Sequence, residues 1–146
     1  MPRYTTTVQS VWPAATSFEY MADLRNFELW DPGVKAAVQL SGGVSEPEAQ
    51  FDVTVGGVLR DVVLRYDTIE YQPPHRVVVR ASNSFLRSLD EIEVRPTPGG
   101  SEIVYSAALD FQGVWRLLNP LLALVFKRIV ERAAGGLREV VSRTEA

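Results

Sequence analysis

"LLALVFKRIVERAAGGLREVV" (Leu121–Val141) places apolar residues three or four positions apart, which predicts one long amphipathic helix. The same apolar stripe begins at Leu117, so Asn119-Pro120 either starts this helix or marks a kink after a preliminary turn. Each glycine inside a helix costs about 1 kcal/mol relative to alanine. We therefore expect Gly135-Gly136 to mark a close approach between this helix and the sheet on which it packs.

Upstream of this helix the apolar residues follow a period of two, which is typical of β-strands. In the second such segment, for example, Val34, Ala36, Val38 and Leu40 share one face. Strands are expected at residues 4–11, 34–40, 51–55, 59–71, 77–83, 86–94 and 103–111, with turns rich in glycine and proline between most of them. Consecutive strands joined in this way predict one antiparallel meander.

Two short helical segments are expected between the first two strands. One covers residues 14–22, and Asp23 can cap a second turn over residues 24–27, because its carboxylate can accept from free N–H groups. Asp31-Pro32-Gly33 ends this bent pair, since the residue before proline avoids helical geometry and glycine permits positive φ. Trp30 stands directly before that stop.

These elements predict an α+β fold in which residues 1–146 form a single domain. A curved antiparallel sheet of about seven strands would wrap around the long C-terminal helix, with two short helices after strand one, an arrangement called a helix grip. A curved sheet and a single helix touch well at one end and separate at the other. We therefore expect an apolar cavity between them, and we expect function to reside there.

The composition disfavours several classes of function. A net charge of -3 indicates no concentrated basic face for nucleic acid. The chain has no cysteine and one histidine, His75, which falls in an expected turn, so we expect no metal and no cofactor. No segment is long and apolar enough for stable membrane insertion, and the N-terminus lacks a secretory signal, which favours a cytoplasmic protein.

Three segments carry a resemblance that covers nearly the whole chain: "FEYMADLRNFELWDPGV" (18–34), "YDTIEYQPPHRVVV" (66–79) and "LDFQGVWRLLNPLLALVFKRIVERAAGGL" (109–137). They resemble the polyketide cyclase/dehydrase-like branch of the START-like (SRPBCC) superfamily. The resemblance implies a helix-grip fold with an internal hydrophobic pocket. Members range from aromatic-ring cyclases to carriers of lipids, hormones and metabolites, so the fold does not fix the reaction.

The resemblance places the bend around Trp30 at the rim of this pocket, where Trp30 would be a wall or a gate. Ordinary core packing is the alternative. The expected lining residues are Trp30, Val38, Val53, Tyr66, Val79, Tyr105 and Phe126. The apolar start of the C-terminal helix can cover the pocket mouth, contact a second copy in a homodimer or touch a membrane, and we favour the first.

Asp90 is the candidate catalytic residue. It shares strand parity with Leu86, Ile92 and Val94, so it is expected on the buried face, where burial raises the pKa of a carboxyl and suits it to acid–base chemistry. A structural hydrogen bond, or a bulge that turns Asp90 to water, is the alternative. Tyr66 and Tyr105 also share parity with apolar neighbours, and each could bind a ligand oxygen or simply pack in the core.

The sequence therefore favours a carrier or sensor that binds a small hydrophobic or aromatic molecule in the cavity. The alternative is a polyketide cyclase or dehydratase that uses Asp90 as acid or base, with Tyr66 or Tyr105 orienting a carbonyl oxygen. Two or more polar groups converging inside the pocket would distinguish the enzyme. A ligand-free interaction module would instead have a filled cavity and an exposed apolar patch.

Overall fold

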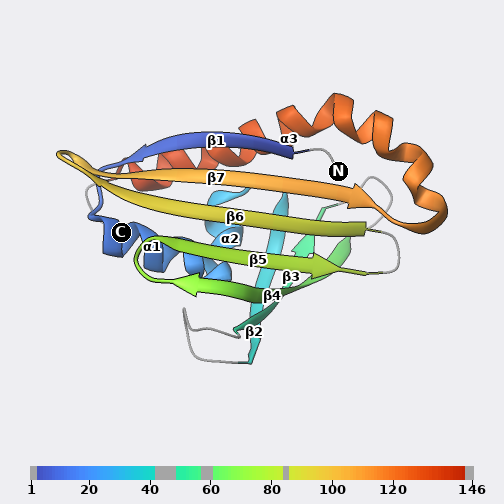
Figure 1. Ribbon diagram of the computed structural model, residues 1–146, viewed down its shortest axis with the longest axis horizontal. Helices are drawn as coiled ribbons and strands as arrows, with labels where there is room; N and C mark the ends of the chain where they lie inside the picture. Colours follow the sequence, from blue (N-terminus) through green and yellow to red (C-terminus); the bar gives the residue numbers. More distant parts are fainter. Residues whose placement is uncertain (1–2, 42–48, 57–60, 84–85, 144–146) are drawn as a thin grey trace.

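The computed structural model describes residues 3–41, 49–56, 61–83 and 86–143. Seven strands form one antiparallel sheet in the order β1-β7-β6-β5-β4-β3-β2. They are β1 (Arg3–Ser10), β2 (Val34–Ser41), β3 (Gln50–Val55), β4 (Val62–Gln72), β5 (Arg76–Ser82), β6 (Leu86–Thr97) and β7 (Gly100–Phe111). The predicted meander is confirmed from β2 to β7, and β1 pairs with β7 (Figure 1). The predicted turns at residues 42–43 and at Gly57 lie outside the described residues.

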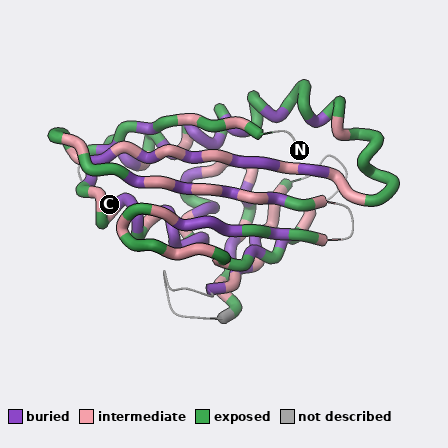
Figure 2. Tube along the Cα trace, viewed as in Figure 1, coloured by how far each residue is buried: buried purple, intermediate pink, exposed green. Residues whose placement is uncertain are grey.

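The helices lie on one side of this sheet (Figure 1). They are α1 (Ala14–Ala22), the 3₁₀ turn η1 (Leu24–Asn26), α2 (Phe27–Trp30), the 3₁₀ turn η2 (Gly113–Leu118) and α3 (Asn119–Val141). α3 packs mainly along β1, and α1 packs against β6 and β7. Figure 2 shows buried residues along the strands, whereas η2 and the start of α3 are largely exposed. The predicted helix-grip α+β fold is confirmed.

The bend between α1 and β2 follows from two aspartates. Asp23 caps η1, because its side chain accepts a hydrogen bond from the Arg25 N–H at 3.1 Å. One α-helical turn then ends at Trp30, and the Asp31 carboxylate accepts from the Gly33 N–H at 2.8 Å. That second contact turns the chain into β2 and fixes the Asp31 side chain beside the helix end.

Asn119-Pro120 starts α3, since the helix begins at Asn119 with Pro120 in its first turn, and the 3₁₀ turn η2 precedes it. The expected close approach involves Gly136 alone, and its partner is α2 rather than the sheet. A Cβ on Gly136 would lie 1.9 Å from the Trp30 carbonyl oxygen, whereas a Cβ on Gly135 would meet nothing within 4 Å.

Strand β2 differs from the predicted alternation. The pairing of β2 with β3 shifts register between Val34 and Ala36, which is the mark of a bulge. Val34 and Ala37 are therefore buried, whereas Val38 is 57% exposed on the outer face. A single inserted residue moves every later side chain to the opposite face, so the expectation that Val38 lines the cavity was wrong.

Candidate functional site

A cavity of about 110 Å³ lies between the sheet and α3. Its apolar walls include Val53 from β3, Leu64 from β4, Ala107 from β7 and Phe126 from α3. Ile129 lines the cavity and is also 38% exposed, so the mouth opens beside α3. The sheet and α3 thus separate as expected, and the space between them is lined chiefly by carbon atoms.

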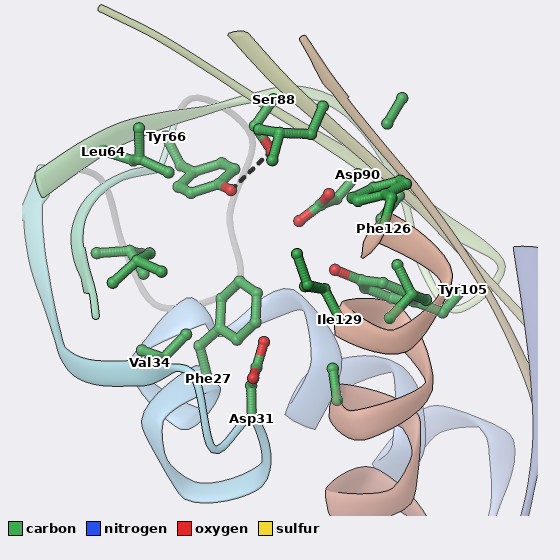
Figure 3. A pocket seen from close by; sticks show the side chains of 17 residues that line it. Phe27, Asp31, Val34, Leu64, Tyr66, Ser88, Asp90, Tyr105, Phe126 and Ile129 are labelled. Carbon is green, nitrogen blue, oxygen red and sulfur yellow. Dashed lines mark hydrogen bonds between the residues drawn. The ribbon is translucent and has the colours of Figure 1, made fainter. Parts of the chain in front are cut away.

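Polar groups from four separate parts of the chain converge in this space. Figure 3 shows the oxygen atoms of Asp31, Tyr66, Asp90 and Tyr105 directed toward the same region. The Tyr66 hydroxyl also hydrogen-bonds the Ser88 hydroxyl, with 2.9 Å between the two oxygen atoms. A ligand in the cavity would therefore contact carbon atoms on most sides, and the oxygen atoms would face it from the region where the four side chains converge.

Asp90 is the most strongly perturbed acid of this group. Its side chain belongs to β6 and is 3% exposed. Burial raises the pKa of Asp90 to about 7, the nearby Asp31 carboxylate adds to the rise, and hydrogen bonding from Tyr105 opposes it. Near neutral pH the carboxyl is therefore divided between its protonated and ionised forms, so it can donate or accept a proton.

The neighbouring groups are also shifted toward their neutral forms. Burial raises the pKa values of Tyr66 and Tyr105 well above the usual range, so both hydroxyls keep their protons. Burial also raises the pKa of Asp31, while the hydrogen bond from Gly33 and the charge of Arg132 oppose the rise. Among the described residues that line the cavity there is no Lys, Arg or His.

The structure divides the expected site residues into two groups. Val53, Tyr66, Asp90, Tyr105 and Phe126 all line the cavity. Trp30, Val79 and Val38 do not line it, which corrects the expected lining.

Trp30 and Val79 belong to the packing behind the cavity. Trp30 is 4% exposed, stacks on Phe27 at 4.7 Å between ring centroids and meets Tyr105 edge-on at 5.7 Å. Trp30 therefore supports two rings of the wall without reaching the space itself. Val79 is 1% exposed and is packed in the core of the sheet.

Sequence reasoning missed several residues of the site, among them Ser88, Phe27 and Asp31. Ser88 shares the parity of Asp90, so the strand pattern already placed it on the inner face. Phe27 and Asp31 were interpreted only as parts of a helical bend. Their second role depends on how α2 packs against α3, which no local pattern in the sequence reveals.

Across the described residues, the His, Asp and Glu side chains form no group of three that could hold a metal ion. Within the same ranges, no helix combines the length and the apolar character needed to cross a bilayer.

Comparisons with known proteins agree with this geometry. The sequence matches the family described as polyketide cyclase/dehydrase and lipid transport over residues 1–142. No curated protein matches it.

Solved structures of similar fold include a START superfamily protein from Mycobacterium smegmatis, with a TM-score of 0.79 and 13% identity over 95% of this chain and 96% of that one. A protein from Thermus thermophilus has a TM-score of 0.75 and 15% identity over 96% and 95% of the two chains. The ZhuI aromatase/cyclase from Streptomyces sp. R1128 has a TM-score of 0.74 and 12% identity over 95% and 90%. At these low identities the TM-scores show a shared fold alone. The family match spans nearly the whole chain, and the chain therefore belongs to the polyketide cyclase/dehydrase and lipid transport family.

Proposed function

We propose that this protein binds a small neutral molecule, aromatic or alkyl, that carries a carbonyl or hydroxyl group. The observation that carries this proposal is the convergence of Asp31, Tyr66, Asp90 and Tyr105 inside an otherwise apolar cavity. Apolar walls would supply most of the binding free energy, and the few polar groups would orient the ligand. Membership of a family that includes lipid transport supports the same function.

The size of the cavity limits the ligand. Its volume is about 110 Å³, and an engineered apolar cavity of about 150 Å³ is known to hold benzene. This cavity is smaller than that one but opens beside α3, so one aromatic ring or a short alkyl chain is the upper limit of what fits in this conformation. A ligand of several fused rings would require the start of α3 to move outward.

The charge of the cavity limits the ligand further. Asp31 and Asp90 both face the space, and the described lining contains no cation to balance them. A carboxylate ligand would be repelled by either acid in its ionised form and would lose its hydration without an ionic partner. A carbonyl ligand can instead accept a hydrogen bond from a tyrosine hydroxyl or from protonated Asp90.

Acetophenone and benzoate test this selectivity, because they share one ring and differ in charge. We expect titrations followed by amide NMR shifts to give a dissociation constant at least about tenfold lower for acetophenone, which corresponds to about 1.4 kcal/mol. The shifts should be largest around Asp90 and Tyr105. Equal binding of the two compounds would contradict the assignment of charge selectivity to the two acids.

A variant that fills the cavity tests whether the ligand binds there. Ala107→Leu adds a side chain inside the cavity wall of β7, and Ser106→Leu adds the same side chain at the adjacent position on the outer face. We expect Ala107→Leu to weaken acetophenone binding at least about tenfold, since it removes the volume that the ring needs. Ser106→Leu should leave binding unchanged. If both variants bind alike, the ligand binds elsewhere and the proposed function fails.

A second candidate function is an enzyme of the cyclase or dehydratase type, and the pKa of about 7 at Asp90 favours it. Asp90 would transfer a proton while Tyr66 or Tyr105 holds a carbonyl oxygen. Native mass spectrometry of protein purified from its own host would identify a bound molecule. An enzyme predicts that this molecule is converted by the native protein and only bound by Asp90→Asn, whereas a carrier predicts binding without conversion in both.

A further inference from the structure

Large apolar side chains cover the outward face of η2 and the first half of α3. We call this face the apolar arch, and it consists of Val114, Trp115, Leu117, Leu118, Leu121, Leu124, Val125 and Ile129. Leu117 is 87% exposed and Leu124 is 78% exposed. In Figure 1 the orange segment curves away beyond the strands, and Figure 2 shows it mostly exposed. An apolar area of this extent marks an interaction site.

The arch is anchored and is not an unpacked end of the chain. The Asn119 side chain accepts from the Phe111 N–H at 2.9 Å and donates to Asp110 at 2.7 Å, and Arg87 pairs with Asp110. These contacts tie the start of α3 to the ends of β6 and β7. On the inner face of the same helix, Leu122 and Phe126 are buried. The outward leucines are therefore held in place by a fixed helix.

The charge of the segment differs in sign from that of the rest of the chain. Residues 111–130 contain Arg116, Lys127 and Arg128 and no acid, which gives +3 within a chain whose net charge is -3 and leaves -6 for the remainder. Within the described residues, Arg116 and Arg128 form no ion pair, and Lys127 meets Glu131 at 4.0 Å. Basic and apolar side chains are thus concentrated in one exposed segment, and the rest of the chain is acidic.

We propose that the apolar arch docks onto the surface of an anionic lipid bilayer. Exposed leucines and a half-exposed tryptophan would enter the boundary between headgroups and acyl chains, and the three cations would meet lipid phosphates. A second copy of this chain fits less well, because a two-fold interface formed by the arch would bring together two copies of a segment, residues 111–130, that carries three cations and no acid. Docking in this orientation would also turn the cavity mouth at Ile129 toward the lipid.

This inference goes beyond the proposed function and is tested separately from it. Sedimentation of the purified protein with phosphatidylcholine vesicles, with and without phosphatidylglycerol, should show binding that requires the anionic lipid and is lost at high salt. Brominated lipid should quench Trp115, while Trp12 and Trp30 are buried within the fold. Equal binding to both kinds of vesicle, or no binding to either, would overturn the proposal.

Paired variants distinguish the arch from a general effect of charge. Leu117→Glu with Leu124→Glu should reduce vesicle binding by at least about tenfold, because two acids oppose both the apolar and the electrostatic attraction. Val38→Glu with Val63→Glu places the same charges on the exposed outer face of the sheet and should have little effect. Thermal unfolding checks that both pairs fold. Equal loss from the two pairs would contradict docking through the arch.

A second pair of variants isolates the cations. Arg116→Gln with Arg128→Gln should weaken binding to anionic vesicles by at least about tenfold, whereas Arg80→Gln with Arg95→Gln on the sheet should change it much less. Analytical ultracentrifugation completes the test. A dimer that dissociates in Leu117→Glu with Leu124→Glu, without vesicle binding by the native protein, would overturn lipid docking and assign the arch to a second copy.

Discussion

Asp90→Asn is expected to raise the free energy of unfolding near pH 8 by up to about 4 kcal/mol, because each unit of pKa shift corresponds to about 1.36 kcal/mol. Burial raises the pKa of Asp90 to about 7, whereas the unfolded chain has a value near the ordinary 3.8. Above pH 7 the folded protein therefore holds a buried carboxylate that the unfolded chain would expose to water. Asparagine keeps the shape of the side chain and removes that charge.

The sign of the pH dependence follows from proton binding. Between about pH 4 and pH 7 folded Asp90 retains a proton that the unfolded chain releases, so the stability of the native protein should fall as pH rises through this window. Below the window both states are protonated, and the difference between native protein and variant should vanish. The raised pKa of Asp31 acts in the same direction in both proteins and cancels in the comparison except for its electrostatic coupling to Asp90.

Urea unfolding of both proteins near pH 4.5, pH 6 and pH 8 measures this difference. Asp67→Asn is the control, since Asp67 is exposed on the outer face of β4 and meets Gln50 there. Its effect should stay within about 0.5 kcal/mol at each pH. If Asp90→Asn destabilises the protein by the same amount at every pH, Asp90 contributes through a hydrogen bond of constant strength and its ionisation is not suppressed by burial.

A destabilising acid in the core bears on function. The fold would be more stable with a neutral residue at position 90, and Tyr105 alone can satisfy only part of a buried carboxylate. Residues that reduce stability without a packing benefit are concentrated at functional sites. The expected gain from Asp90→Asn would therefore support a role for Asp90 in ligand binding or in proton transfer.

The period of the apolar residues was enough to predict most of the fold and part of the site. The inner positions of β4 and β6 alternate without interruption near the cavity, and those of β7 alternate as far as Ala107, so Tyr66, Asp90 and Tyr105 could be placed on the buried face. In β2 the same reasoning failed at Val38, because a bulge is a local exception that a period of two cannot represent.

The remaining part of the site depends on contacts between elements far apart in sequence. Asp31 faces the cavity because α2 packs against α3, and Trp30 lies behind the cavity wall for the same reason. Nothing in "FELWDPGV" distinguishes a residue that faces a cavity from one that packs behind it. The positions of Asp31 and Phe27 thus depend on the packing of α2 on α3.

Gly136→Ala should destabilise the protein by about 2 to 3 kcal/mol, the scale of overpacking in a filled core. The new Cβ would lie 1.9 Å from the Trp30 carbonyl oxygen and 3.1 Å from its carbon, and backbone atoms cannot rotate away as a side chain can. α2 and α3 would have to separate. Gly135→Ala is the matched control, because its Cβ meets nothing within 4 Å and alanine favours the helix by about 0.5 to 1 kcal/mol.

Gly136→Ala should also change the affinity for the ligand. Trp30 stacks on Phe27, and both Phe27 and Asp31 line the cavity, so a displaced α2 changes one wall and moves one of the two acids. We expect Gly136→Ala to weaken acetophenone binding severalfold and Gly135→Ala to leave it unchanged, as measured by the NMR titration at a temperature where both variants are folded. Equal stability of the two variants would show that α2 does not pack on α3 as closely as the structure has it. Lower stability with unchanged affinity would show that the ligand does not contact the wall formed by Phe27 and Asp31.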